Sequence, residues 1–256
     1  METGIRDYSV YLHRMQQSVL DKLFFFDKIF EPVKNILDFG CANGEMLKCL
    51  HLFSCSYRFI GYDISETMIG AAKANVPGAE FYSRWEDIQL DPAESLVNIS
   101  STLHEVYSYG TEEDVEIFWK RILRSGFKYI SIRDMMVSDA ADGAPDGAAL
   151  ELVRSNEAYA DKLRDYEAHW GPIRTQSSLV HYLLKYSYTE NWAREVRENY
   201  LPITVEKLLA MVPEEYEITY HRHYVLPYTA WQIKRDFGIT LTTPTHVQLL
   251  LKKKDT

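Results

Sequence analysis

Short apolar runs alternate with amphipathic segments along residues 35–133, and no other feature limits the possible folds of this chain as strongly. Each run is bounded by polar or glycine residues, which is typical of a strand buried inside a sheet. Parallel strands need crossover helices, so the alternation predicts a mostly parallel, doubly wound α/β sheet with helices on both faces. The expected strands are 35–40, 57–62, 79–82, 95–101 and 127–132, with helices beginning near 45, 65 and 111.

Further segments are expected to complete this core. Residues 8–30 carry apolar side chains at helical spacing, which predicts an amphipathic N-terminal helix. Residues 148–170 and 179–200 also have helical character and many aromatic side chains, so we expect a helical cap inserted after the fifth strand. The expected regions are an N-terminal segment (1–33), the core (34–139), the cap (140–201) and a C-terminal region (202–256).

The C-terminal region is expected to return the chain to the sheet. A helix over 203–211 would lead back from the cap. Segments 216–224 and 246–252 alternate or run apolar, as strands do, and a linking segment with Pro227 joins them. They predict an antiparallel pair at one edge of the sheet.

Composition restricts the cellular setting and the partners. The three cysteines lie close together and are odd in number, which favours reduced thiols in a cytoplasmic protein and no metal site. The formal net charge of −9 argues against a broad nucleic-acid footprint. The apolar runs are too short to cross a bilayer and no export signal is evident, so no membrane association is expected.

The most informative local feature is the glycine-rich turn Asp38-Phe39-Gly40-Cys41-Ala42-Asn43-Gly44, between an expected strand and an expected helix. Glycine lets a backbone turn sharply, and the free N–H groups at a helix start bind anionic groups. Ala42 and Glu45 occupy the second and third glycine positions of the pattern G-x-G-x-x-G, which disfavours NAD and FAD. The turn predicts a ligand site at the carboxyl edge of the sheet.

Asp63 ends the second expected strand, about 20 positions after the glycine turn. A carboxylate there can accept hydrogen bonds from both hydroxyls of a ribose. The alternative is that Asp63 caps the next helix, but Ser65 is already suited to that role. The ribose role is therefore favoured.

Taken together, these motifs resemble those of the class I S-adenosylmethionine-dependent methyltransferases. Asp38-x-Gly40-x-x-x-Gly44 resembles their glycine-rich first motif, and Asp63 matches their acidic ribose-binding position. Ser100-Ser101-Thr102-Leu103-His104-Glu105-Val106 is similar to the motif that follows their fourth strand. The resemblance covers residues 35–133 and the C-terminal edge, and it implies a Rossmann-like fold, S-adenosylmethionine as cofactor and methyl transfer as the activity.

The resemblance also implies which residues contact the cofactor. The turn would line its methionine part, with Asp38 orienting the turn or contacting the amino group. Asp63 would hold the ribose, and Ile64 would pack against the adenine. A polar or acidic residue after the third strand would contact the adenine amine, with Glu86, Asp87 and Trp85 as candidates, unless that stretch is only a surface loop. The expected cofactor-binding residues are Asp38, Gly40, Cys41, Gly44, Asp63, Ile64, Met68, Glu86, Asp87 and Ser101.

His104 is the expected catalytic residue, because the resemblance places it near the transferred methyl group. It would act as general base for a hydroxyl or amine acceptor, or else it packs against or caps the next segment. Arg133 and Asp134 end the fifth strand at the same edge, where they either bind substrate or pair with each other. The cap aromatics either form a core or cover a substrate.

The expected function is methyl transfer to a nucleophilic atom of a small molecule, which the acidic balance and the aromatic cap favour. An RNA methyltransferase that uses the basic C-terminal edge is a second hypothesis. A non-catalytic S-adenosylmethionine-binding module is a third, because a fold alone does not decide between them.

Overall fold

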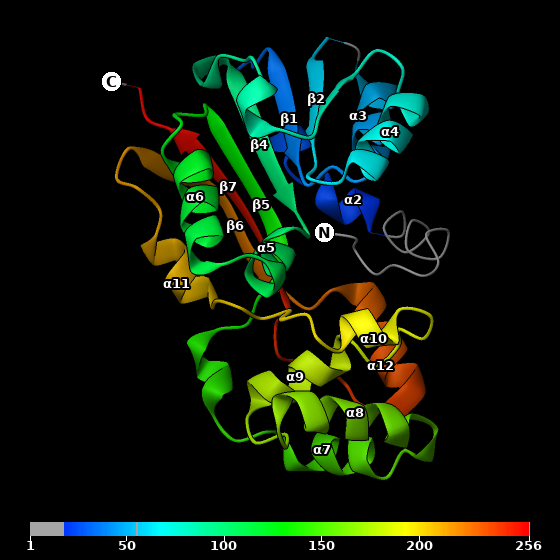
Figure 1. Ribbon diagram of the computed structural model, residues 1–256. Coiled ribbons are helices and arrows are strands. Elements are labelled where there is room, and N and C mark those ends of the chain that lie inside the picture. Colours follow the sequence, from blue (N-terminus) through cyan, green and yellow to red (C-terminus); the bar gives the residue numbers. More distant parts are fainter. Residues whose placement is uncertain (1–17, 55, 256) are drawn as a thin grey trace.

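A seven-stranded sheet forms the centre of the computed structural model, which describes residues 18–54 and 56–255 (Figure 1). The strands are β1 (Asn35–Phe39), β2 (Arg58–Tyr62), β3 (Glu80–Tyr82), β4 (Ser95–Ser100), β5 (Tyr129–Met135), β6 (Tyr216–Tyr224) and β7 (His246–Lys253). Their order is β3-β2-β1-β4-β5-β7-β6. Strands β1 to β5 pair in parallel, whereas β7 is antiparallel to both β5 and β6. The expected mostly parallel sheet with an antiparallel C-terminal edge is confirmed.

Helices cover both faces of the sheet. The α-helices are α2 (Val19–Lys22), α3 (Glu45–Phe53), α4 (Glu66–Asn75), α5 (Leu103–Tyr109), α6 (Glu112–Leu123), α7 (Gly147–Arg154), α8 (Ala160–Trp170), α9 (Gln176–Leu183), α10 (Trp192–Glu195), α11 (Val205–Ala210) and α12 (Pro227–Phe237). Neighbouring residues of a strand face opposite sides. Accordingly, Ile36 of β1 packs in the cluster that contains α3 and α4, and Leu37 packs in the cluster that contains α6 and α11.

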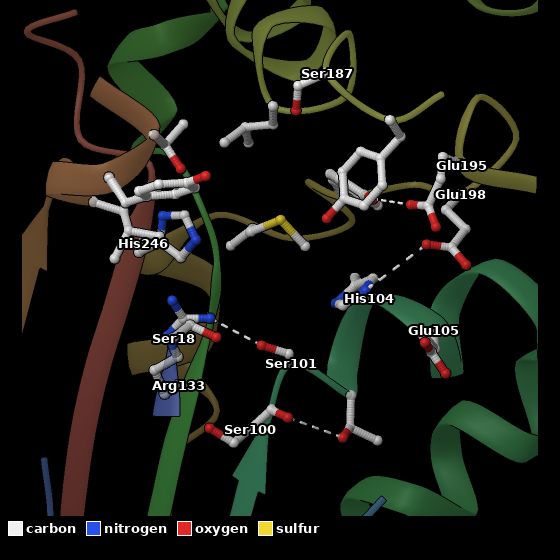
Figure 2. Close-up of a pocket in the computed structure, with 18 of the residues that line it drawn as sticks. Ser18, Ser100, Ser101, His104, Glu105, Arg133, Ser187, Glu195, Glu198 and His246 are labelled. Carbon is white, nitrogen blue, oxygen red and sulfur yellow. Dashed lines mark hydrogen bonds and ion pairs between the residues drawn. The ribbon is translucent and has the colours of Figure 1, made fainter. Parts of the chain in front are cut away.

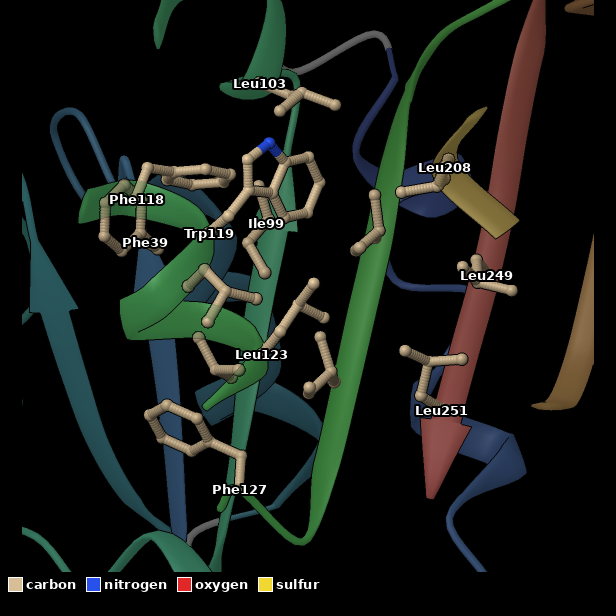
Figure 3. Close-up of a cluster of buried hydrophobic side chains, with 14 of the residues drawn as sticks. Phe39, Ile99, Leu103, Phe118, Trp119, Leu123, Phe127, Leu208, Leu249 and Leu251 are labelled. Atoms are coloured by element: carbon tan, nitrogen blue, oxygen red, sulfur yellow. The ribbon is translucent and has the colours of Figure 1, made fainter. Parts of the chain in front are cut away.

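The α6 side of the sheet forms the larger core cluster (Figure 3). Phe118 and Trp119 of α6 lie over β1 and β4, and Leu249 and Leu251 bring β7 into the same core. Burying one such side chain contributes about 1.5–3 kcal/mol. Strand β7 is therefore held by apolar packing as well as by its hydrogen bonds to β5 and β6.

The expected N-terminal helix over 8–30 is wrong in its described part; residues 8–17 lie outside the described residues. Helix α2 ends at Lys22, and only a short 3-10 turn, Phe26–Lys28, follows. Three consecutive aromatic side chains explain the break. Phe25 is fully buried, Phe24 packs against Tyr220, and Phe26 packs against Tyr57. The three rings pack against different neighbours, and this tertiary packing prevents the continuous helix that the apolar spacing predicts.

The two long helices expected over 148–170 and 179–200 are shorter and interrupted. The first divides into α7 and α8, because the Asn156 side chain accepts a hydrogen bond from the Ala158 N–H and starts a 3-10 turn at 157–159. The second is reduced to α9 and α10. None of the described helices has the length and apolar character needed to cross a bilayer.

The segment that links β6 to β7 is a helix, α12, which the linking segment around Pro227 did not suggest. Pro227 occupies the first turn of α12, where a missing N–H has no cost. Its buried side chains Ile233 and Phe237 pack in one cluster with α7, α8 and α9. We call α7 to α10 together with α12 the cap. The cap lies beyond the carboxyl ends of the parallel strands (Figure 1).

Phe237→Ala is expected to lower the free energy of unfolding by about 3–5 kcal/mol, because it leaves a cavity in the cap core. The Phe237 ring centroid lies 4.7 Å from that of Tyr186 and 5.2 Å from that of Tyr159. Leu152→Ala is the matched control, since Leu152 is 44% exposed on α7. Urea unfolding measures both variants. Equal effects of the two substitutions would show that α12 is not part of the cap core.

Candidate functional site

A cavity of about 640 Å³ lies between the carboxyl ends of the parallel strands and the cap (Figure 2). The sheet contributes the glycine turn after β1, the residue after β2, the end of β4 with the segment that follows it, and the end of β5. The cap closes the opposite side with residues from α9, α10 and α12. This is the edge at which open α/β sheets bind ligands, and the volume is typical of a small-molecule site.

The glycine turn is held against β2. Gly40 and Gly44 have φ angles of +78° and +79°, a region that favours glycine, and Ala42 also has a positive φ of +46°. A Cβ atom on Gly40 would lie 2.3 Å from Oγ1 of Thr102, so the turn also needs glycine for space. The Gly40 and Cys41 N–H groups donate to the Tyr62 carbonyl at 2.8 and 3.0 Å. The turn therefore has a fixed conformation where it lines the cavity.

Asp63 connects the turn to the start of α4. Its carboxylate accepts hydrogen bonds from the Ala42 N–H at 2.9 Å and the Ser65 N–H at 2.8 Å. Burial raises the pKa of Asp63, although both N–H groups oppose that rise. Ser65 caps α4 by accepting from the Met68 N–H, which leaves Asp63 facing the cavity. Each carboxylate oxygen still has a lone pair for a further donor.

Four of the expected site residues line the cavity together: Gly40, Asp63, Ser101 and His104. The other expected residues lie outside this lining. Asp38, Cys41 and Met68 are buried behind it, and Gly44 starts α3. Ile64 is 71% exposed, an open apolar surface beside Asp63. Glu86 accepts a hydrogen bond from Arg121, and Asp87 lies 4.0 Å from Arg84, both at the protein surface.

Asp38 supports the turn from below. It accepts a hydrogen bond from Nδ2 of Asn98 at 3.1 Å, and burial raises its pKa to about 7. Lys22 is the cation that most favours its charged form. This geometry suits the orienting role that the sequence suggested for Asp38.

His104 is clamped between two carboxylates. Its Nδ1 lies 2.8 Å from Oδ1 of Asp134, and its Nε2 lies 3.9 Å from Oε2 of Glu198 in the cap. Burial opposes protonation, but Asp134 and Glu198 outweigh it and raise the pKa of His104 to about 9. The imidazole therefore carries a proton at neutral pH in the free protein.

Arg133 and Asp134 do not pair with each other. Strand β5 extends three residues beyond its expected end at residue 132, to Met135, so both residues belong to the sheet. Arg133 donates to Oδ2 of Asp21 at 2.7 Å and to Oγ of Ser101 at 2.8 Å. Ser101 has a positive φ of +56°, which is uncommon for serine and occurs often at functional sites.

Lys22 is a cavity residue that no sequence motif marks. It is only 6% exposed and lines the cavity, yet its Nζ makes no hydrogen bond or ion pair with any described residue. Burial and the charge of Arg133 lower its pKa to about 8. Its neighbour Asp21 fixes α2, since it also accepts hydrogen bonds from Tyr224 and Gln248. A lysine on the apolar face of the expected helix was the available sequence signal.

Ser100 adds a second open polar group to the lining of the same cavity. Its Oγ is buried, lines the same cavity and has no hydrogen-bond partner within the described part of the chain. Buried polar groups without partners are rare and costly, which marks this part of the cavity as a binding site.

These groups fit the charged and polar parts of S-adenosylmethionine. Asp63 can accept from ribose hydroxyls, and the exposed Ile64 offers an apolar surface for an adenine. Lys22 and Ser100 present unused donors that match a carboxylate. The glycine turn lets a ligand approach its backbone closely, because the two turn residues that line the cavity, Gly40 and Ala42, have no side chain or only a methyl group.

A family model for the methyltransferase domain matches residues 11–138, half of the 256-residue chain. No curated protein shows significant sequence similarity to the chain. Solved structures do match. One is the plantazolicin methyltransferase BamL in complex with a triazolic desmethylPZN analog and SAH, with a TM-score of 0.54 and 11% identity over 93% of this chain and 85% of that chain.

Two further solved structures share this fold. An S-adenosylmethionine-dependent methyltransferase from Anabaena variabilis has a TM-score of 0.51 and 16% identity over 93% of this chain and 85% of that chain. A methyltransferase of the same cofactor class from Listeria monocytogenes has a TM-score of 0.50 and 16% identity over 92% of this chain and 99% of that chain. At such low identities the likeness establishes the fold.

The raised pKa of His104 predicts a pH-dependent contribution to stability. The folded pKa of about 9 exceeds the ordinary value of 6.5, so this contribution is complete below pH 6.5 and is lost as the pH rises through 9. Its size is up to about 3 kcal/mol, because one pKa unit corresponds to about 1.4 kcal/mol. We expect wild type to lose more stability than His104→Gln between these pH values in urea unfolding.

His51→Gln is the control for this comparison, since His51 lies at the exposed surface of α3. It should keep the wild-type pH dependence. Identical pH slopes for wild type and His104→Gln would contradict the proton on the imidazole.

Proposed function

Because this chain belongs to the methyltransferase domain family and is an S-adenosylmethionine-dependent methyltransferase of class I fold, we propose that it methylates a small molecule enclosed beneath the cap. One observation carries the proposal: the cavity of about 640 Å³ opens between the glycine turn and the cap, with His104 on its wall. Such a volume accommodates the cofactor and a small acceptor side by side.

The cofactor end of the cavity is proposed to be the sheet side. There the glycine turn contributes backbone groups, Asp63 holds the ribose hydroxyls, and Ile64 covers the adenine. We add Lys22 and Ser100 as partners of the cofactor carboxylate, because both are buried, face the cavity and lack partners among the described residues. Asp21 fixes the position of Lys22 through its bonds to β5, β6 and β7.

When bound, S-adenosylmethionine supplies a methyl group activated by its sulfonium charge. The protein then acts chiefly by positioning the acceptor and by excluding water, and the cap provides both. We propose His104 as the general base, oriented by Asp134 through Nδ1 so that Nε2 faces the cap. His104 accepts a proton only after its pKa falls. A positive charge near Glu198 has that effect, because Glu198 is one of the carboxylates that raise it.

The basic C-terminal edge gives little support to an RNA substrate. Lys252 pairs with Glu31 and lies 3.9 Å from Glu217, and Lys254 donates to the Glu214 carbonyl at 2.6 Å. These contacts use charges that a phosphate backbone would need. A cytoplasmic location is also part of the proposal, supported by Cys41 and Cys49, which are free thiols.

Calorimetric titration with S-adenosylhomocysteine tests the cofactor end. Asp63→Ala should weaken binding by about tenfold or more, because it removes hydrogen bonds to a charged acceptor. Asp161→Ala is the matched control, since its side chain is 90% exposed on α8. No binding by folded wild-type protein would refute the cofactor site. Binding without methylation of any small molecule in a mass-spectrometric screen would instead favour a non-catalytic module.

Lys22→Met separates the carboxylate contact from the ribose contact. It should weaken S-adenosylhomocysteine by about tenfold or more and leave 5′-methylthioadenosine unchanged, since the latter has the ribose but no carboxylate. Asp63→Ala should weaken both ligands. A similar loss for both ligands in Lys22→Met would assign Lys22 to the fold instead of the cofactor.

A further inference from the structure

Two carboxylates of the cap line the cavity on the same side as His104. Glu195 ends α10 and Glu198 follows it, and both project into the space next to the imidazole (Figure 2). They are 3% and 1% exposed, so they are among the most buried acids of the described chain. Charges buried to this degree need partners.

Each carboxylate uses one oxygen within the protein. Oε1 of Glu198 accepts a hydrogen bond from the Tyr109 hydroxyl at 2.8 Å and lies 2.7 Å from Arg194. Oε2 of Glu195 accepts a hydrogen bond from the Tyr200 hydroxyl. In both residues, therefore, only one of the two carboxylate oxygens accepts a hydrogen bond from the protein.

The second oxygens receive no hydrogen bond from any described residue. Oε1 of Glu195 has Arg194 at 3.9 Å, and Oε2 of Glu198 has His104 at 3.9 Å, both beyond hydrogen-bond distance. Both side chains line the cavity, so these oxygens are available to a ligand. An acceptor left open on a buried carboxylate is costly unless a donor arrives.

The nearby cations are engaged elsewhere. Arg194 contacts Glu105 at 3.0 Å as well as Glu198, and His104 is held by Asp134. Lys185 donates to the backbone carbonyls of Glu195 and Glu198 and lies over the Tyr200 ring. Among the described residues that contact one another here, four are acids (Glu105, Asp134, Glu195 and Glu198) and three are bases (His104, Lys185 and Arg194).

The electrostatics of the cluster favour the binding of a cation. Burial and the neighbouring Glu195 raise the pKa of Glu198 to about 7. Burial lowers the pKa of Lys185 to about 7, which weakens its compensation of the two acids. An added positive charge between the carboxylates would keep both ionised.

We propose that the acceptor substrate carries a protonated amine that binds between the open oxygens of Glu195 and Glu198. This inference rests on the proposed function and names its substrate class. An ammonium group has three donors and no acceptor, which matches two open carboxylate oxygens. The protonated nitrogen has no lone pair, so in this bound form it is a recognition group, and the methylated atom is a different atom of the substrate.

The test uses the full-length protein saturated with S-adenosylhomocysteine, which prevents turnover. The probes are primary amines from ethylamine to tyramine, each paired with the alcohol and the carboxylate of the same carbon skeleton. Thermal shift ranks the probes, and calorimetry measures the binders. At least one amine should bind about tenfold or more tightly than its alcohol, while the carboxylates should not bind.

Glu195→Gln and Glu198→Gln should each abolish that preference without changing the affinity for S-adenosylhomocysteine. Glu151→Gln on the exposed side of α7 is the matched control and should keep it. An unchanged circular dichroism spectrum and an unchanged affinity for S-adenosylhomocysteine would show that a variant is folded. If one variant fails to fold, the other still tests the proposal.

Three outcomes would overturn the proposal. Alcohols or carboxylates could bind as well as the amines, or no probe could bind the saturated protein. A third is that the glutamine variants weaken the binding of S-adenosylmethionine but not that of S-adenosylhomocysteine. That result would show that the two acids interact with the sulfonium of the cofactor instead of a substrate amine. Absence of S-adenosylhomocysteine binding by wild type instead refutes the proposed function, and the same probes applied without it still test the amine site.

Discussion

The carboxylate of Asp134 determines the arrangement of the site. It is buried at the end of β5 and accepts hydrogen bonds from the Leu103 N–H, the Met135 N–H and the His104 ring, each at 2.8 Å. A buried charge is tolerated only when its acceptors are satisfied, and these three donors satisfy it. The same bonds fix the first turn of α5 and select the ring nitrogen that faces the cap. These hydrogen bonds therefore join the segment after β4 to the end of β5.

The sheet and its glycine turn were predictable because their signals are local. Asp63 was identified from its distance to Gly40, and the structure places both at one cavity. The cap was only partly predictable. Its helical character is visible in the sequence, but the breaks arise from side chains such as Asn156 that bond back to the chain, and α12 is stabilised by contacts with residues far away.

The polar residues that were missed share one property: their importance depends on what surrounds them. Lys22 lies on the apolar face of the expected helix, but its importance becomes clear only because α2 packs against the end of the sheet and buries it. Glu195 and Glu198 likewise read as acids on a polar helix. Burial, which no short window of sequence records, changes the energy of all three. His104 was found because its position after a strand is part of a recurring local motif.

The cap is assembled from two stretches that leave the sheet at different points, one between β5 and α11 and the other between β6 and β7. The residues proposed to bind the methyl donor, in contrast, lie within a single stretch from α2 to β5. If the cap selects the acceptor as proposed, acceptor preference is encoded at two distant places in the gene. Transplanting it into a related sheet requires both stretches, because the first alone lacks the packing of Ile233 and Phe237, and α12 alone lacks the two glutamates.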